Sequence, residues 1–177
     1  ENEKAFTVDG YFRTGDAGRM EGNTLFFTER IKDLYKTSNG KYIAPQAIEM
    51  VMSGDQYIEQ IAVIGDQRKF VSALIVPAYS LLEKYAEEKG LAVGSRKELV
   101  RNKEILRLIE THIEENQKNL ASYEKIKRFT LLSEPFTMGS ELTDTLKLRR
   151  SVILKKYADP IEKMYEEASN MWGSNPV

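Results

Sequence analysis

Two apolar segments constrain the fold of this chain most strongly. They read IEQIAVI (58–64) and FVSALIV (70–76), and both are short and rich in β-branched residues. Apolar runs of this length and composition are typical of strands that lie in a protein core. The sequence therefore predicts a buried sheet around which the rest of the chain must be arranged.

Helices are predicted directly after these strands. SLLE (80–83) has the pattern of a capping box, in which a serine and a glutamate three residues later cap a helix start, and Gly90 is placed to end that helix. SRKE (95–98) is a second such box. A longer amphipathic helix is predicted from Asn102, and its apolar face consists of Ile105, Leu106, Leu108, Ile109 and Ile113.

The remaining elements are shorter. Glycine turns divide the first part of the chain into strands at 5–8, 11–13 and 24–31, and an Asn-Gly turn joins strands at 33–36 and 41–44 in a hairpin. Three more elements are then predicted: a helix over 45–52 that begins with Pro45, a strand over 126–132, and a helix from Arg149 that Pro160 interrupts or restarts. We expect residues 170–177 to be poorly ordered.

Together these elements predict an α+β fold: a small domain with a β-hairpin and a short mixed sheet covered by helices, from about residue 33 onward. The strand segment in front is too short to form a domain, and we expect it to pack on a part of the protein outside this sequence. The first residue is Glu1 and not methionine. We therefore expect the chain to be a portion of a longer protein.

Composition excludes several function classes. The 26 basic and 27 acidic residues almost cancel, whereas nucleic-acid binding usually needs a basic excess. Without cysteine there is no disulfide, thiolate metal site or cysteine nucleophile. His112 is the single histidine. We expect it to be structural or solvated and not catalytic, with no partner nearby, and we expect no metal site. No apolar run is long enough to cross a bilayer.

Three stretches carry candidate functional residues. In GYFRTGDAG (10–18), Asp16 could accept hydrogen bonds from ribose hydroxyls or could simply satisfy a turn. In TERIKDLYKTSNGKYIAPQAIE (28–49), Arg30 and Lys36 suit phosphate or ribose contacts, although a solvated edge strand has the same charges. In SELTDTLKLRR (140–150), we expect Lys147 on an extended segment, where it could neutralise charge at a phosphorus centre or only begin a basic helix. The sequence contains neither a P-loop nor a GxGxxG motif.

In this order, the three stretches resemble the C-terminal portion of adenylate-forming enzymes, and specifically of long-chain fatty acid–CoA ligases (acyl-CoA synthetases). GYFRTGDAG resembles the family's ribose-binding motif. ERIKDLYKTSNGKYIAPQAIE resembles its hinge and hairpin, and LASYEKIKRFTLLSEPFT followed by ELTDTLKLRR resembles the segment that presents its catalytic lysine. The resemblance implies residues 1–31 as the end of the large AMP-binding domain and residues 32–177 as a C-terminal lid domain.

The resemblance also implies residue roles. Asp16 and Arg30 would contact the ribose, Lys147 would contact the α-phosphate and the attacking carboxylate, and Lys32 would lie on the hinge. After rotation of the lid, a second set would approach the adenylate and the pantetheine arm of CoA: Lys36, Ser38, Asn39, Gly40 and Lys41. The sequence departs from the family at Asp144, where proline is common, and at Glu29 and Ile31, which replace the usual aspartate and lysine.

The activity implied is ATP-dependent ligation of a fatty acid to CoA through an acyl-adenylate, with release of AMP and pyrophosphate. ATP, Mg²⁺ and CoA would be required, with the Mg²⁺ ligands outside this chain, which alone would be inactive. The large domain of the same protein is an expected partner, and the expected location is cytoplasmic, including the membrane periphery. Two alternatives remain open: an acyl-carrier-protein ligase or another adenylate-forming enzyme, and a stand-alone, non-catalytic binding module.

Overall fold

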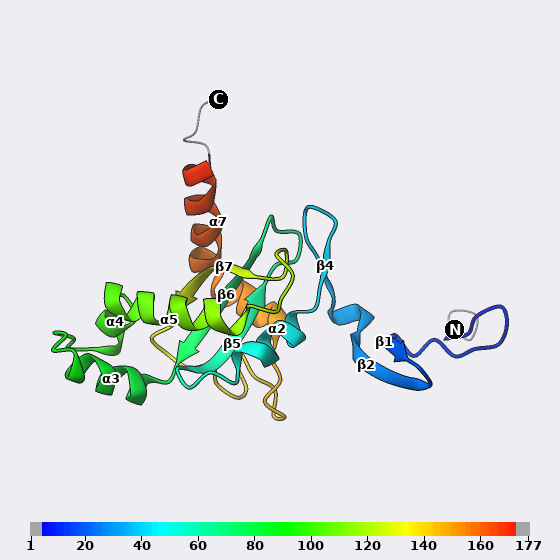
Figure 1. Cartoon of the computed structure of the whole chain (residues 1–177), viewed down its shortest axis with the longest axis horizontal. Coiled ribbons are helices and arrows are strands. Elements are labelled where there is room, and N and C mark those ends of the chain that lie inside the picture. The colour runs from blue at the N-terminus through cyan, green and yellow to red at the C-terminus, as the bar shows by residue number, and fades with distance from the viewer. Residues whose placement is uncertain (1–4, 173–177) are drawn as a thin grey trace.

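The computed structural model describes residues 5–172, and a three-stranded sheet forms the centre of the main domain (Figure 1). The middle strand is β6 (Val71–Pro77), which pairs antiparallel with β5 (Ile58–Ile64) and parallel with β7 (Ile126–Leu131). Every residue of β6 is buried. Both faces of this strand are therefore covered, which explains why its sequence is apolar without alternation.

Helices provide that cover. In Figure 1, α2 (Pro45–Met52) and α5 (Lys103–Asn116) lie in front of the sheet, and α6 (Arg150–Lys156) lies behind it. The chain then turns into α7 (Ala158–Trp172), while α3 (Tyr79–Glu88) and α4 (Arg96–Leu99) pack against each other at one end. The side chains that fill the core from these elements include Ile48, Met52, Leu74, Ile75, Leu82, Leu99, Ile105, Ile109, Ile153 and Ile161.

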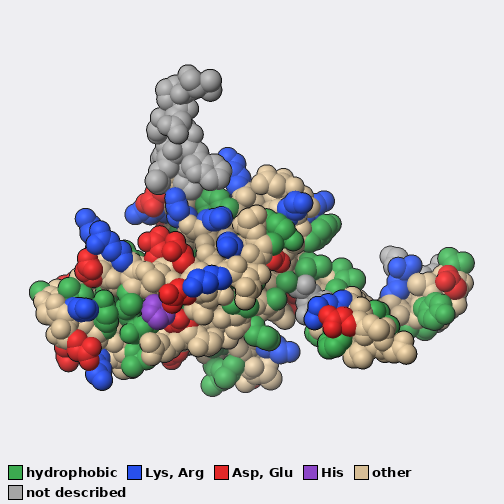
Figure 2. All heavy atoms as spheres, in the orientation of Figure 1, with side chains coloured by type: hydrophobic (Ala, Val, Ile, Leu, Met, Phe, Trp, Pro, Cys, Tyr) green, Lys and Arg blue, Asp and Glu red, His purple; other side chains and the backbone are tan. Residues whose placement is uncertain are grey.

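An N-terminal arm, residues 5–30, extends away from this domain (Figure 1). It contains an antiparallel pair of strands, β1 (Asp16–Glu21) and β2 (Thr24–Arg30). The 3-10 helix η1 (Ile31–Asp33), which has no buried residue, leads to the two short strands β3 (Tyr35–Lys36) and β4 (Tyr42–Ile43). Apolar side chains lie on the surface of the arm (Figure 2), among them Val8, Tyr11, Phe12, Met20, Leu25 and Phe27.

The structure corrects several local predictions. Residues 5–8 and 11–13 are not strands but share a single bridge between Phe6 and Phe12, and β1 was not predicted at all. Residues 170–172 continue α7, and the rest of the predicted disordered tail, 173–177, lies outside the described residues. The predicted strand over 24–31 ends at Arg30, because Ile31 already begins η1.

The helix starts differ in how they are capped. Asn102 caps α5, since its side-chain oxygen accepts from the N–H groups of Glu104 and Ile105 at 2.9 and 3.4 Å. Ser95 caps α4 by accepting from the Glu98 N–H at 3.3 Å. The capping box at Ser80 is wrong, because α3 begins one residue earlier at the buried Tyr79, whose hydroxyl donates to the Leu132 carbonyl at 2.9 Å.

This contrast predicts unequal effects of two similar substitutions. Asn102→Ala should lower the free energy of unfolding by about 1 kcal/mol, the usual value of a helix cap. Ser80→Ala should change it by less than about 0.5 kcal/mol, because an exposed position without such a role tolerates substitution. Urea denaturation of the 177-residue chain measures both, and equal effects would show that the Asn102 contacts do not act as a cap.

Candidate active site

Asp16 and Arg30 lie side by side on the arm. They are register partners across β1 and β2, and the Asp16 carboxylate lies 3.6 Å from the Arg30 Nε. The backbone reaches this position through Gly15, whose φ of +77° is costly for other residues. Their side chains are 36% and 73% exposed, and such a pair is worth at most about 1 kcal/mol. Both groups are therefore available to a ligand.

A cleft of about 930 Å³ connects the arm with the main domain. Arg30 and Lys32 line it from the arm and η1, and Lys147 lines it from the segment before α6. The fold thus brings together Arg30, Lys32 and Lys147, three of the residues singled out in the sequence. Its other lining residues include Phe27, Asp33, Gln46, Glu49, Leu146, Leu148, Arg150 and Ser151.

Lys147 lies on a tight turn and not on the extended segment that the sequence predicted. Thr143 closes the turn from both sides: its N–H donates to the Lys147 carbonyl at 2.9 Å, and its hydroxyl accepts from the Lys147 N–H at 3.1 Å. Leu146, the residue before the lysine, has a φ of +59°, which is strained for a residue with a side chain. The turn therefore projects an exposed lysine on a backbone that is not free to relax.

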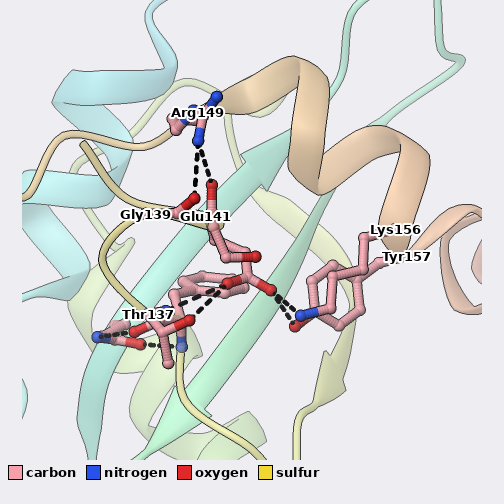
Figure 3. A network of polar contacts seen from close by, with 9 residues as sticks. Thr137, Gly139, Glu141, Arg149, Lys156 and Tyr157 are labelled. Atoms are coloured by element: carbon pink, nitrogen blue, oxygen red, sulfur yellow. Dashed lines mark hydrogen bonds and ion pairs between the residues drawn. The ribbon is translucent and has the colours of Figure 1, made fainter.

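Glu141, two residues before this turn, carries a buried carboxylate, whose contacts are drawn in Figure 3. Glu141 is fully buried, and its carboxylate accepts from the Thr137 N–H at 3.2 Å, the Tyr157 hydroxyl at 3.1 Å and the Lys156 ammonium. Burial alone would raise the pKa of Glu141, but hydrogen bonds from the Lys156 ammonium and the Thr137 N–H hold the pKa at about 2. Sequence reasoning missed this residue, because nothing local distinguishes it from a solvated glutamate.

The low pKa of Glu141 predicts a pH dependence of stability. Its pKa is lower in the folded state than the ordinary 4.5, so its contribution is complete above about pH 4.5 and is lost as the pH falls towards 2. We expect the free energy of unfolding of the 177-residue chain to fall over this range, and to fall less steeply in Glu141→Gln. Denaturant titrations at several pH values test this; parallel curves for the two proteins would contradict it.

A half-buried ion pair, Glu49 with Arg150, forms one wall of the cleft. Arg150 donates to both carboxylate oxygens of Glu49 at 2.9 and 2.8 Å, and Glu49 also accepts from the Val63 N–H at 2.8 Å. The Arg150 guanidinium lies 5.4 Å from the ring centroid of Tyr35. Burial raises the pKa of Glu49 despite its arginine partner. The pair fixes the first residue of α6 against α2 and β5.

The predicted hairpin residues do not line this cleft. The turn from Thr37 to Lys41 is closed by backbone bonds, and Gly40 adopts a φ of +76° there. Lys36 lies over the ring of Tyr42, and its N–H donates to Asp66 at 3.2 Å. The hairpin instead borders a separate cleft of about 250 Å³ through Thr37, Asn39 and Lys41. Half of the residues that line this cleft are basic: Lys41, Lys69, Lys125, Lys127 and Arg128.

Comparison with known proteins identifies the family of the main domain. Residues 32–169 match the model of the AMP-binding enzyme C-terminal domain family. The chain belongs to this family.

Relatives with named activities match almost the whole chain. The chain is 31% identical over 172 residues to long-chain-fatty-acid–CoA ligase FadD15 of Mycobacterium tuberculosis. This alignment covers 94% of the chain and 29% of that protein. It is 33% identical over 171 residues to long-chain-fatty-acid–CoA ligase 5 of Mus musculus, with 94% and 25% covered. The chain therefore spans less than a third of the length of these relatives.

Solved structures confirm the fold of the domain. The adenylation domain of a carboxylate reductase from Mycobacterium chelonae superposes with a TM-score of 0.72 at 28% identity, covering 92% of the chain and 24% of that protein. The adenylation domain of a carboxylic acid reductase from Segniliparus rugosus, solved with AMP and a co-purified carboxylic acid, also gives 0.72, at 24% identity and with 93% and 25% covered. The predicted α+β fold and the resemblance to adenylate-forming enzymes are confirmed.

His112 has a partner that sequence reasoning did not foresee. Its Nδ1 lies 2.7 Å from Oδ2 of Asp55, and the Asn116 side chain donates to the same oxygen at 2.8 Å. The other oxygen of Asp55 accepts from the Tyr57 N–H at 2.8 Å. Burial would raise the pKa of Asp55, but the Tyr57, His112 and Asn116 donors lower it. These contacts join α5 to the loop after α2.

Residues 5–172 offer neither a metal site nor a membrane span. No group of three or more histidine, aspartate or glutamate side chains in this part of the chain could hold a metal ion. No helix there is long and apolar enough to cross a membrane.

Proposed function

We propose that this chain is the C-terminal part of an ATP-dependent fatty acid–CoA ligase. One observation carries the proposal: Lys147 and Arg30, which lie far apart in the sequence, line the same cleft, and Asp16 pairs with that arginine. The relatives named above are long-chain-fatty-acid–CoA ligases over almost the whole chain, which supports the same activity. The complete protein would form an acyl-adenylate and then acyl-CoA, releasing pyrophosphate and AMP.

In the first step, a fatty carboxylate attacks the α-phosphorus of ATP. Asp16 accepts hydrogen bonds from the ribose hydroxyls, and Arg30 contacts the same ribose. Lys147 reaches across the cleft to the α-phosphate and the attacking carboxylate, where negative charge concentrates as the new bond forms. Its position on a strained, closed turn supports this role, because a fixed cation loses little freedom on meeting its ligand.

In the second step, the CoA thiol attacks the acyl carbon and AMP leaves. We propose that the lid rotates about Lys32, which withdraws Lys147 and brings Lys36 and the turn Ser38, Asn39, Gly40 and Lys41 to the adenylate and the pantetheine arm. The separation of the two clefts in this structure supports such a rotation. The basic lining beside the hairpin is of the sign that the phosphates of CoA require.

The domain division follows from the same hypothesis. Residues 1–31 would be the end of the large AMP-binding domain, and residues 32–177 would be the lid. Exposed apolar side chains on the arm support a missing neighbour, since contiguous exposed apolar surface marks an interaction site. We propose further that the Mg²⁺ ligands and the acyl site lie elsewhere in the complete protein, that this chain alone is inactive, and that the enzyme acts in the cytoplasm or at a membrane surface.

A second candidate keeps the adenylation step and changes the acceptor. Carboxylate reductase adenylation domains are among the similar structures, one of them solved with an adjoining carrier-protein domain. An enzyme of this kind would pass the acyl group to the thiol of a carrier protein. The names of the sequence relatives favour CoA.

The decisive experiment uses the complete protein that carries this chain. Fatty acids of different lengths are assayed for carboxylate-dependent ATP–pyrophosphate exchange and, with CoA or a carrier protein, for thioester formation. Exchange followed by acyl-CoA formation supports the proposal. Exchange with a carrier-protein acceptor alone selects the second candidate, and no exchange with any fatty acid overturns both.

Asp16 provides a sharper prediction. In the complete protein, Asp16→Ala should raise the KM for ATP by about tenfold or more, because hydrogen bonds to a charged group are worth about 1.5–3 kcal/mol. Asp9→Ala, on the same arm, is the matched control and should change the KM by less than about twofold, as exposed sites without contacts usually do. Equal KM values for the two variants would remove Asp16 from the site.

A further inference from the structure

The turn that carries Lys147 depends on contacts below it. Residues 144–147 are exposed, and the hydrogen bonds that close the turn are made within the turn itself. Under the turn, Leu142 pairs with Leu148 and, on its other side, with Met138. Leu142 is buried, so this small ladder is where the turn meets the core.

Arg149 ties the two ends of this segment together. Its N–H donates to the Glu141 carbonyl at 2.7 Å, and its guanidinium donates to the carbonyls of Gly139 and Ser140 at 3.0 and 3.1 Å (Figure 3). Arg149 is two residues from Lys147. The backbone position of Lys147 is therefore set by the placement of residues 139–141.

Glu141 in turn fixes those residues to the domain. Its carboxylate accepts from Thr137, which lies between β7 and this segment, and from Lys156 and Tyr157 at the end of α6 (Figure 3). One buried side chain thus joins the start of the segment, the base of the turn and the helix that follows. In the part of the chain that the structure describes, Glu141 is the acidic side chain with the lowest exposure, 0%.

Burying a carboxylate costs free energy, because the charged group loses its contacts with water. A well-packed apolar side chain often stabilises a protein as much as a buried ion pair, whereas directional hydrogen bonds select one arrangement among several. Here Thr137 donates to one carboxylate oxygen, and Lys156 and Tyr157 donate to the other. The carboxylate therefore fixes two separate parts of the chain relative to each other.

We propose that Glu141 is a positioning residue that sets the place of Lys147 at the cleft. It acts through the Arg149 clamp and the Leu142–Leu148 pairing and does not itself touch the substrate. This inference rests on the proposed function in one respect, namely that Lys147 acts in adenylation.

The test compares two variants of the complete protein. Glu141→Gln keeps the shape of the side chain and removes its charge. Asp55→Asn is the matched control, because Asp55 is also a buried carboxylate with three donors but lies away from the cleft. Both are assayed for carboxylate-dependent ATP–pyrophosphate exchange and for thioester formation from a preformed acyl-adenylate and CoA.

We expect Glu141→Gln to lower kcat for exchange by about 10- to 100-fold, the usual effect of a small misplacement of a reacting group, with little change in the KM for ATP. Thioester formation should stay within about twofold, and Asp55→Asn should change neither rate by more than that. A structural role alone would lower both rates together, and that outcome overturns the proposal. If Glu141→Gln does not fold, Tyr157→Phe, which removes one donor, should lower exchange selectively.

Amide hydrogen exchange on the 177-residue chain separates this inference from the proposed function. The N–H groups of Leu146 and Lys147 both donate to Thr143, and they should exchange faster in Glu141→Gln but not in Asp55→Asn. Unchanged exchange at these amides overturns the positioning role. A different result would separate the two proposals. If these amide hydrogens exchange faster in Glu141→Gln but the unmodified complete protein has no ATP–pyrophosphate exchange activity, the proposed function is refuted and the positioning role remains.

Discussion

Lys147→Ala in the complete protein should lower carboxylate-dependent ATP–pyrophosphate exchange by about 10²–10³-fold, the usual loss when a group that stabilises charge in the transition state is removed. The reason is that Lys147 is the cation that the 143–147 turn presents to the cleft shared with Arg30. Thioester formation from a preformed acyl-adenylate and CoA should remain within about twofold, because the lysine would have left the site by then.

Two controls define this result. Lys155→Ala removes an exposed lysine of α6 that does not line the cleft, and both activities should survive it. If both also survive Lys147→Ala, the lysine is only a basic residue before a helix. If both collapse while the protein remains folded, Lys147 serves the two steps and the rotation proposed above is wrong.

Lys32→Pro should have the opposite effect. Proline fixes φ near −65°, which suits the 3-10 helix that Lys32 occupies but prevents a large change of that angle. The lid would be held with Lys147 at the cleft, as in this structure. Exchange should persist within a few-fold, while thioester formation should fall by about tenfold or more, as expected when a required conformational step is blocked.

Lys32→Ala separates the side chain from the backbone in this experiment. It removes the ammonium group but leaves φ free, so thioester formation should stay close to that of the unmodified protein. Equal losses in the alanine and proline variants would assign the effect to the lysine charge. Undiminished thioester formation in the proline variant would place the hinge at another residue.

The elements that could be predicted from sequence are those whose signal is local. The apolar runs of β5 and β6, Pro45 at the start of α2, and Asn102 before the spaced isoleucines of α5 all describe their own surroundings. The failures occurred where a distant contact decided the outcome. The burial of Tyr79 moved the start of α3 away from Ser80, and the polar residues of β1 give little sign of pairing with β2.

The candidate site shows the same division. Asp16, Arg30 and Lys147 could be singled out from the motifs in which they lie. Only the resemblance of these motifs to a known family indicated that the three residues bind a common ligand; their separation in the sequence did not. The cleft that joins Arg30 to Lys147 is a product of tertiary folding. Glu141 and the Glu49–Arg150 pair escaped notice because an ion pair between residues far apart leaves no periodic pattern in a sequence.

The hairpin turn (37–41) and the turn that carries Lys147 (143–147) are both attached to one continuous core. Ile43 of β4 and Leu142 beneath the turn belong to the same set of buried side chains. A body packed in this way cannot shorten the distance between its two loops. If each loop serves one step at the same reaction site, only one of them can lie at that site at a time. The order of the two reactions would then need no signal between sites, since the arrival of one loop is itself the departure of the other.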